Sequence, residues 1–251
     1  MTTTTAQFDA LAERYDAYNA VRDRLAPATA RWLASHLPGG RRAVDLGCGP
    51  GRFTPLLANR YDRVLAVDLS ERMIRIAGQR RSRPNVTYER RSLLDVTPGQ
   101  DGLFDAVLSV NAVHHAGPLP AVLAQVGRLV APGGRLLLVD IVNPGGWGDL
   151  DWHVGQAFAA ARHFYDAGGQ DTDAAADVIR LLAHPRWLEM TFADVPPTRA
   201  EYRRWAEAAF PGAEFTDDLH PLGLQTALAW RPQTPSLDRP AGDLAAEDAG
   251  A

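Results

Sequence analysis

The most informative part of this 251-residue chain reads Val44-Asp45-Leu46-Gly47-Cys48-Gly49-Pro50-Gly51-Arg52-Phe53-Thr54, and the apolar run Val64-Leu65-Ala66-Val67 follows it and ends at Asp68. The pattern predicts a strand, a glycine turn, a helix and a second strand that ends in an acid. Three glycines at alternate positions let the backbone turn sharply and approach a ligand closely, because glycine has no Cβ. A carboxylate at the end of the second strand can accept hydrogen bonds from both ribose hydroxyls. The unit therefore indicates a ligand that contains adenosine.

The residues around the glycines indicate which adenosine ligand to expect. A dinucleotide fingerprint has glycine at each marked position of G-x-G-x-x-G, and here Arg52 occupies the third. Asp45 stands two residues before the first glycine, where a carboxylate would repel a phosphate but attract an ammonium group. Taken singly, the glycines could be turn chemistry and Asp68 could cap a helix near Ser70. Their joint spacing favours a ligand with a cationic amino acid tail.

In these residues the chain resembles the class I S-adenosylmethionine-dependent methyltransferases, whose first motif is D-x-G-x-G-x-G and whose second is a strand that ends in an acid. The resemblance covers residues 40–142 strongly and the flanks weakly. It implies an α/β fold with a Rossmann-like, doubly wound, mostly parallel seven-stranded sheet and an antiparallel edge strand. It also implies amino-terminal lid helices, a helical insertion after the fifth strand, and S-adenosylmethionine as the cofactor.

The resemblance implies a set of cofactor contacts. Ser92 stands where the family usually has an acid that holds the adenine amino group, so the contact is expected from Ser92 or, after a shift in register, from Asp95. Tyr15 lies in a stretch that resembles the family's lid helix and would contact the cofactor's carboxylate or cover its methyl group. Cys48 is expected to be a small buried residue rather than a nucleophile. The resemblance implies that the adenine lies between Leu69, Met73, Leu93 and Leu94, although a plain core role suits each of them equally well. The expected contact residues are Tyr15, Asp45, Gly47, Cys48, Gly49, Gly51, Asp68, Leu69, Met73, Ser92, Leu93, Leu94 and Val110.

Residues 104–115 resemble the family's fourth strand, which often ends in a His-His pair. Methyl transfer to a hydroxyl or an activated carbon needs a general base, and histidine suits that role near neutral pH. His115 would face the site from the carboxyl end of this strand, where such sheets bind ligands. We therefore expect His115 to be the catalytic base or to orient the substrate, unless it is a loop histidine bonded to backbone. His114 is expected to be its structural neighbour.

The rest of the chain alternates between strand and helix patterns, as a parallel sheet requires. Strands are expected at 43–47, 63–68, 85–90, 104–110 and 135–142, with helices near 52–60, 70–81 and 119–130. A helix at 198–209 and an antiparallel hairpin of strands at 213–218 and 224–231 should complete the sheet. The expected division is lid helices at 1–39, a cofactor-binding core at 40–142, a helical insertion at 143–197, a final helix and edge strands at 198–231, and a disordered tail at 232–251.

Composition excludes several classes of function. A single cysteine allows no internal disulfide, and all 26 basic residues are arginine, which removes Schiff-base lysines and the P-loop. With no long apolar run and no signal-peptide pattern, a cytoplasmic location without a membrane partner is expected. Arginine and alanine usage suggests a bacterial genome rich in GC. No metal site is expected, because Asp140 alone does not make a magnesium site and His153 and His163 fall roughly 80° apart around their helix, which disfavours a shared metal.

Two further groups of residues bear on the partner. The arginines between positions 80 and 91 could contact RNA, but a solvated helix end is the simpler interpretation, and the net charge of −4 gives no general attraction to nucleic acid. A small-molecule acceptor is therefore expected. Aromatic residues of the insertion fit a pocket wall, the insertion's own core or the surface of a homodimer equally well; they are Trp147, Trp152, Phe158, Phe164, Tyr165 and Trp187.

The sequence thus predicts a methyltransferase that acts on an oxygen, nitrogen or carbon atom of a small metabolite. Two alternatives remain open. The fold could bind S-adenosylmethionine but catalyse a cyclisation or rearrangement without methylation, or it could be a binding partner that has lost turnover. The intact set of glycines and acids argues against loss of the cofactor.

Overall fold

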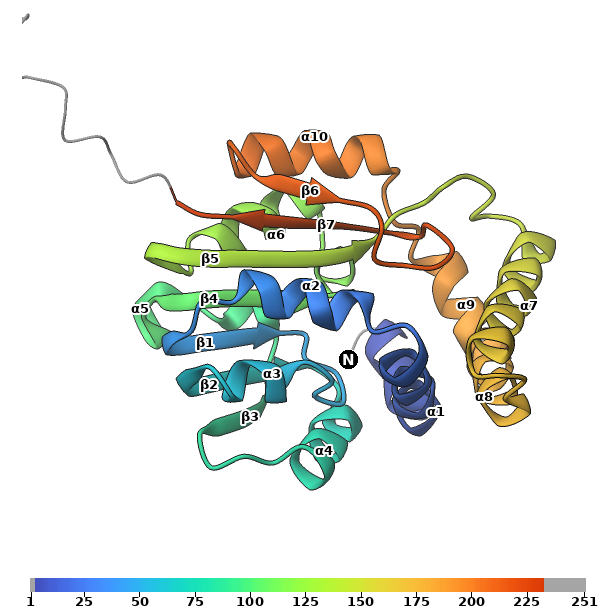
Figure 1. Ribbon diagram of the computed structural model, residues 1–251. Helices are drawn as coiled ribbons and strands as arrows, with labels where there is room; N and C mark the ends of the chain where they lie inside the picture. The colour runs from blue at the N-terminus through green and yellow to red at the C-terminus, as the bar shows by residue number, and fades with distance from the viewer. Residues whose placement is uncertain (1–2, 233–251) are drawn as a thin grey trace, which may run out of the picture.

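The computed structural model describes residues 3–232, which form a seven-stranded sheet flanked by helices (Figure 1). The strands are β1 (Gly40–Leu46), β2 (Tyr61–Asp68), β3 (Val86–Arg90), β4 (Phe104–Val110), β5 (Val130–Ile141), β6 (Glu214–Thr216) and β7 (Gln225–Trp230). The helices are α1 (Thr3–Leu25), α2 (Ala28–His36), α3 (Thr54–Ala58), α4 (Glu71–Arg80), α5 (Pro98–Asp101), α6 (Leu119–Gly127), α7 (Leu150–Ala167), α8 (Thr172–Leu182), α9 (Pro185–Ala193) and α10 (Arg199–Ala209), with 3-10 turns η1 (Leu93–Asp95) and η2 (Val113–His115). Apart from Pro232, the expected disordered tail lies outside the described residues.

The strand order is β3-β2-β1-β4-β5-β7-β6. The first five strands are parallel, and β7 runs antiparallel to both β5 and β6. The order reverses between β1 and β4, and in such sheets the crevice at the carboxyl ends of these two strands is where ligands bind. This confirms the expected doubly wound, mostly parallel sheet and the hairpin at its edge. The antiparallel strand is β7, one position in from the short outermost strand β6.

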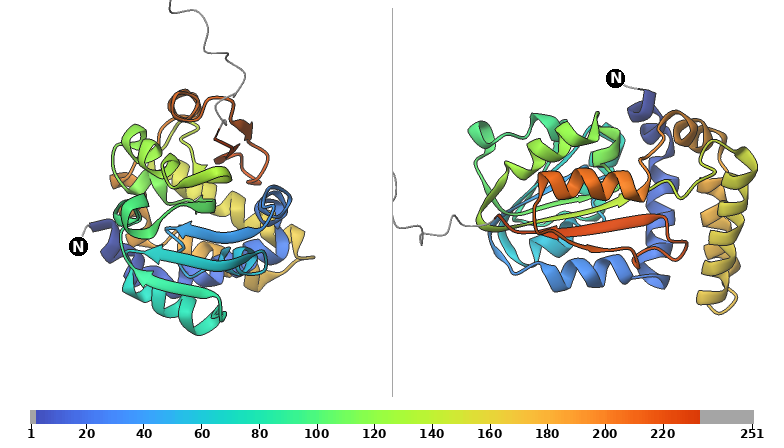
Figure 2. Two further views of the ribbon diagram at one scale, coloured as in Figure 1. Left: turned by 90° about the vertical axis from the view of Figure 1, so that its left-hand side faces the viewer. Right: turned by 90° about the horizontal axis from the view of Figure 1, so that it is seen from above.

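Both faces of the sheet are covered by helices (Figure 2). On one face α6 and α10 bury Leu123 and Tyr202 against the strands, and on the other α2 and α3 bury Leu33 and Leu57. The central strands β4 and β7 are mostly apolar and buried, because helices cover both faces of the sheet there, whereas the outer strands β3 and β6 are polar and partly exposed. Helix α6 ends at Gly127 rather than at the expected residue 130. Val130 is already the first residue of β5 and pairs with Phe104 of β4.

Helix α1 lies across the carboxyl ends of the parallel strands, between the sheet and α7 and α8 (Figure 2, right). One apolar cluster joins Leu11 and Tyr18 of α1 to Phe164 and Val178 of the two other helices. The carboxyl end of the sheet is therefore covered by two layers of helix rather than open to water.

Ion pairs hold α1 to α4. Asp16 is buried and bonds Arg80 and Arg81, the latter with Nη2 2.7 Å from Asp16 Oδ1, while Glu13 pairs with Arg72 at 3.1 Å. The interpretation of this arginine group as a simply solvated helix end is therefore wrong for Arg81. Its carboxylate partner lies far away in sequence, and only the docking of α1 on α4 brings the two together.

The three helices α7, α8 and α9 are inserted between β5 and α10, and the two ends of the insertion meet. Asn143 forms a β-bridge with Thr198, and its backbone N–H donates to the Pro197 carbonyl at 2.9 Å. Helix α10 then starts with a capping box formed by Thr198 and Glu201. Within residues 3–232, no helix combines the length and apolar character that crossing a bilayer requires.

Candidate active site

The turn between β1 and α3 contains the three glycines, and each has a positive φ, which favours glycine. A Cβ on Gly47 would stand 2.3 Å from the Ala112 Cβ, so the turn lies directly against the loop after β4. A Cβ on Gly49 would point at the Tyr15 ring 3.8 Å away, into the space between the turn and α1. Gly51 instead faces Ala77 and the Tyr88 hydroxyl, each 3.1 Å from its ideal Cβ position.

A pocket of about 290 Å³ opens between this turn, the ends of β2 and β4, and α1. The structure brings nearly all of the expected cofactor contacts together in its lining: Tyr15, Asp45, Gly47, Cys48, Gly49, Asp68, Leu69, Met73, Ser92, Leu93 and Val110. Gly51 and Leu94 lie outside the lining, because Gly51 packs against α4 and Leu94 packs against the hydrophobic core. We refer to this space as the cofactor pocket.

Asp68 ends β2 in the wall of the cofactor pocket. Its Oδ2 accepts a hydrogen bond from the Gly49 N–H and its Oδ1 one from the Ser70 N–H, both at 2.8 Å. Burial raises the pKa of this carboxyl, and the two backbone donors partly oppose that rise. The donors fix the orientation of the carboxylate, while each oxygen keeps a lone pair for a hydroxyl of a ligand.

Asp45 lies deeper, buried beneath the glycine turn. Its Oδ2 accepts a hydrogen bond from the Thr54 hydroxyl at 2.7 Å. Burial raises its pKa to about 7; the Thr54 bond opposes this rise and the nearby Asp68 adds to it. A carboxylate that is this hard to ionise is stabilised by a cation placed beside it. The electrostatics therefore match the expected ammonium group.

The outer end of the cofactor pocket is apolar. Leu69 stands 47% exposed at its rim, whereas Met73 and Leu93 are buried in its wall. Ser92 lines the pocket and its hydroxyl accepts the Leu94 N–H at 3.2 Å, while Asp95 is exposed and lies outside the lining. Of the two residues considered for the adenine contact, only Ser92 faces the space.

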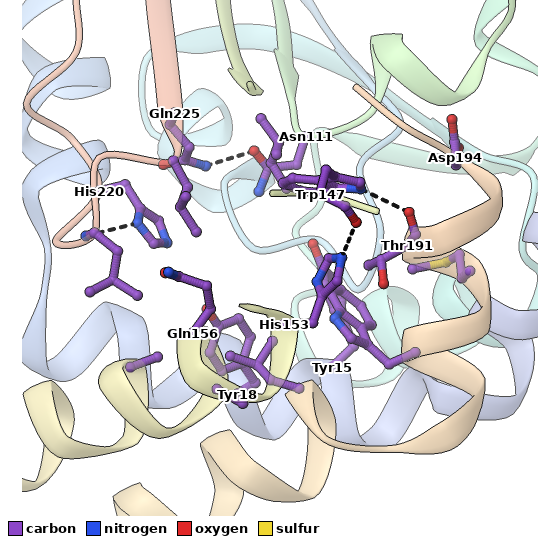
Figure 3. Close-up of a pocket in the computed structure, with 18 of the residues that line it drawn as sticks. Tyr15, Tyr18, Asn111, Trp147, His153, Gln156, Thr191, Asp194, His220 and Gln225 are labelled. Carbon is purple, nitrogen blue, oxygen red and sulfur yellow. Dashed lines mark hydrogen bonds between the residues drawn. The ribbon is translucent and has the colours of Figure 1, made fainter. Parts of the chain in front are cut away.

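A second cavity of about 110 Å³ adjoins the first, between α1, α7, α9 and the loop before β7 (Figure 3). Both cavities are lined by Phe8, Tyr15, Asn111 and His115. Trp147, Trp152 and Trp187 line this second cavity, as expected of a pocket wall. We call it the acceptor pocket, after the role proposed for it below. Phe158, Phe164 and Tyr165 do not: Phe158 is 59% exposed and Phe164 is buried against Tyr18, because the cavity-facing stripe of α7 runs through His153, Ala157 and Ala160.

His115 stands where the two pockets meet, in η2 directly after β4. Its Nδ1 is hydrogen-bonded to the Asp194 carboxylate at the end of α9. Burial lowers the pKa of His115 and the charge of His114 lowers it further, while Asp194 only partly opposes both. The ring is therefore neutral at neutral pH, with the proton on Nδ1 shared with Asp194 and Nε2 left as the basic nitrogen.

His114 has a different surrounding. Its Nδ1 lies 2.5 Å from Oδ1 of the fully buried Asp140 in β5. Burial lowers the pKa of His114, but the charge of Asp140, the hydrogen bond with it and the charge of Asp194 together outweigh burial and raise the pKa. The His114–Asp140 pair thus ties η2 to the sheet and holds the neighbouring His115 ring, 3.8 Å away between centroids.

Sequence reasoning missed Asp194. Nothing near it in the sequence indicates a site, because its role depends on α9 folding back over η2, 79 residues away. The hydrogen bond from Gln225 Nε2 to Asn111 Oδ1, at 2.6 Å, was missed for the same reason (Figure 3). A sequence pattern within one strand or helix carries no information on such pairs.

Comparisons with known proteins find similar methyltransferases. Residues 44–138 match a family described as a methyltransferase domain. The demethylmenaquinone methyltransferase of Tropheryma whipplei (strain Twist) is 32% identical over 141 residues, which are 55% of this chain and 58% of that protein. The ubiquinone biosynthesis O-methyltransferase of Xanthomonas axonopodis pv. citri (strain 306) is 30% identical over 138 residues, 53% and 58% of the two chains. The matches thus span less than two thirds of these relatives.

Among solved structures, a DhpI–SAH complex has a TM-score of 0.61 and 22% identity and covers 92% of this chain and 97% of that one. This likeness extends the fold agreement from the matched domain to the amino-terminal helices and the final strands. Residues 44–138 are thus similar to a methyltransferase domain, and the chain shares its fold with the solved DhpI complex.

Proposed function

We propose that this protein transfers a methyl group from S-adenosylmethionine to an oxygen, nitrogen or carbon atom of a small, partly aromatic or apolar metabolite. The single observation that carries the proposal is the position of the His115–Asp194 pair at the junction of the two pockets. A base at this junction would lie between a bound cofactor and a bound acceptor.

The cofactor pocket fits S-adenosylmethionine in its chemistry. Asp68 presents oriented acceptors for the ribose hydroxyls, and Asp45 offers a buried negative charge toward the ammonium group. The gap between Gly49 and Tyr15 is space that a Cβ would partly fill. Leu69, Met73 and Leu93 supply apolar surface for adenine, beside the Ser92 hydroxyl. When bound, S-adenosylmethionine supplies an electrophilic methyl group.

The protein's own part is alignment and proton removal. Asp194 holds the His115 imidazole in one tautomer, so that Nε2 can take the proton that the acceptor's hydroxyl, amine or activated carbon loses. The resulting imidazolium is stabilised by the Asp194 carboxylate. Tyr15 and Phe8 line both pockets, so their rings would exclude water from the junction when both ligands are bound.

Two of the similar proteins are named for methylation in quinone biosynthesis, which is consistent with an aromatic acceptor. A cavity of about 110 Å³ lined by tryptophans also supports a small molecule over a nucleic acid. No observation favours the non-methylating alternative, and product analysis separates the two reactions. A methylated product has gained one methyl group in mass, whereas a cyclised or rearranged product has not.

The first test is isothermal titration of the protein with S-adenosylhomocysteine, with NAD as the control ligand. We expect micromolar binding of S-adenosylhomocysteine and none of NAD. If NAD binds instead, or neither ligand binds, the cofactor assignment and the proposed reaction both fail.

A further inference from the structure

Arg22, in the last turn of α1, is a buried cation in the wall of the acceptor pocket. Only 5% of its surface is exposed, and no carboxylate among residues 3–232 lies within ion-pair distance of it. Its hydrogen-bond partner is neutral: Nη2 donates to Gln225 Oε1 at 3.4 Å. Burying a guanidinium without a counter-charge is costly, so an anion that entered the pocket would stabilise this arrangement.

The arginine of the cofactor pocket, unlike Arg22, has a carboxylate partner. Arg52 lines that pocket, and its Nε lies 2.6 Å from the Asp23 carboxylate. Its charge is thus already balanced by the protein. Arg22 lines only the acceptor pocket, so an anion bound to Arg22 most simply belongs to the acceptor.

Two neutral donors surround the same end of the acceptor pocket. The His220 Nδ1 accepts a hydrogen bond from the Leu222 N–H at 3.1 Å, so the proton of the neutral ring resides on Nε2. Burial lowers the pKa of His220 to about 3, and the charge of Arg22 contributes, so the ring stays neutral over the working range. Gln156 extends its amide toward this end from α7 (Figure 3).

The base lies at the other end. Figure 3 shows Asp194, the partner of His115, on the far side of the cavity from His220 and Gln225. The tryptophan side chains at positions 147, 152 and 187 line the space between the two ends. The pocket therefore has an anion-binding end, an apolar aromatic middle and a proton-accepting end.

We propose that the acceptor is a small aromatic or apolar carboxylic acid, whose carboxylate is bound by Arg22 with His220 and Gln156 while the atom to be methylated lies beside His115. This inference rests on the proposed function and adds the substrate class. A guanidinium and a carboxylate form paired hydrogen bonds with defined direction, so the same contact would select acids and fix the acceptor's orientation. The carboxylate of the cofactor's amino acid tail has the same chemistry, and the experiment separates the two sources.

The probes are phenylacetate and 4-hydroxyphenylacetate, each compared with its primary amide, in titrations followed by ligand-observed NMR with and without saturating S-adenosylhomocysteine. We expect each acid to bind at least about tenfold more tightly than its amide, as loss of a charge-assisted hydrogen bond implies. Arg22→Gln should abolish this preference and Arg22→Lys should retain part of it. Arg14→Gln is the matched control, because Arg14 is exposed on the same helix and lines neither pocket. Circular dichroism checks that each variant is folded.

Equal binding of acids and amides, binding of no acid, or a preference that survives in Arg22→Gln would overturn the inference. So would an Arg22→Gln variant whose affinity for S-adenosylhomocysteine falls tenfold or more while its acid preference is intact, because Arg22 would then hold the cofactor's carboxylate. If the wild-type protein does not bind S-adenosylhomocysteine at all, the proposed function fails, whatever the acids do. If it binds S-adenosylhomocysteine but does not prefer acids, only the substrate class is wrong.

Discussion

The two carboxylates of the cofactor pocket could be identified from sequence because each is fixed by its own strand. Asp45 lies next to the end of β1 and Asp68 ends β2, so local spacing alone determines that both point into the turn region. Their electrostatic difference could not be predicted in this way. Asp68 has two backbone donors and Asp45 a single hydroxyl donor, and that distinction exists only in the folded turn.

Asp45 should make ligand binding depend on pH. Its pKa of about 7 in the free protein means that it is partly protonated at neutral pH, and a bound ammonium group favours the ionised form and lowers the pKa. Affinity for S-adenosylhomocysteine should therefore fall as pH decreases from 8 to 6, by at most about tenfold per pH unit. Titration calorimetry across this range measures the effect.

Two variants serve as controls. Asp45→Asn should bind S-adenosylhomocysteine more weakly at pH 8, with an affinity that does not change with pH, whereas a variant of the exposed Asp62, Asp62→Asn, should behave as wild type. If the affinity of Asp45→Asn still changes with pH, the pH dependence belongs to another group.

The His115–Asp194 pair predicts a particular pH–rate profile once an acceptor is known. Because the pKa of His115 is lowered, kcat should be maximal at neutral pH and fall only as pH drops through that lowered value. Asp194 raises the pKa of His115, so Asp194→Asn should move the acid limb to lower pH and reduce the plateau. His115→Ala should reduce kcat by about 10²–10⁴ and remove the limb. Affinity for S-adenosylhomocysteine is the control and should change little; an acid limb that does not move in Asp194→Asn contradicts the pairing.

At the level of elements, α1 is the part that joins both pockets. It supplies Tyr15 to each, Arg22 to one, and Asp16 to the contact with α4. The sequence predicted a helix here but not its partners, since helix periodicity indicates which face is apolar and not which helix that face meets. For the same reason the sequence could not show which aromatic residues of α7 line a pocket and which belong to a core: Trp152 faces the pocket and Phe164 packs against α8.

Asp16→Asn should loosen α1 without unfolding the sheet. The substitution removes the charge that Arg80 and Arg81 share and leaves Arg81, which is largely buried, with a weaker partner. Hydrogen–deuterium exchange should show faster exchange of the α1 amides, with β1 and β4 unchanged, and the cofactor's KM should rise. Asp166→Asn is a suitable control, because Asp166 forms an exposed pair with Arg162 within α7. Unchanged protection of α1 would mean that its apolar contacts alone hold it.

For the whole molecule, a mostly parallel sheet could be predicted from the alternation of strands and helices, whereas the acceptor pocket depends on contacts between distant segments. The core from β1 to β5 obeys local rules of burial and turn chemistry. The acceptor pocket combines α1, α7, α9 and the loop before β7, and no single segment contains enough of it to be recognised. We keep residues 143–197 as a proposed unit that shapes this pocket.

Ligand binding should stabilise the whole fold, because the cofactor pocket is built from α1 and three strands that separate on unfolding. At a concentration of about 100 times Kd, S-adenosylhomocysteine should add about 2.7 kcal/mol to the free energy of unfolding. For a chain of this size that corresponds to a rise in Tm of about 5–10 °C. Differential scanning calorimetry measures the shift, with NAD as the control; a Tm that does not move at saturating ligand contradicts binding to the folded state.

The backbone contact between Asn143 and Pro197 has a consequence for how such proteins diversify. Because the segment leaves and re-enters the core at almost the same point, its replacement by another helical segment requires no change in the position of β5 or α10. Selection for a new acceptor can therefore act on residues 143–197 while the glycine turn and the strands that form the cofactor pocket stay unchanged. A single fold can in this way acquire many acceptors. The segment between Asn143 and Pro197 is therefore the part of the chain to exchange between relatives in a chimeric protein.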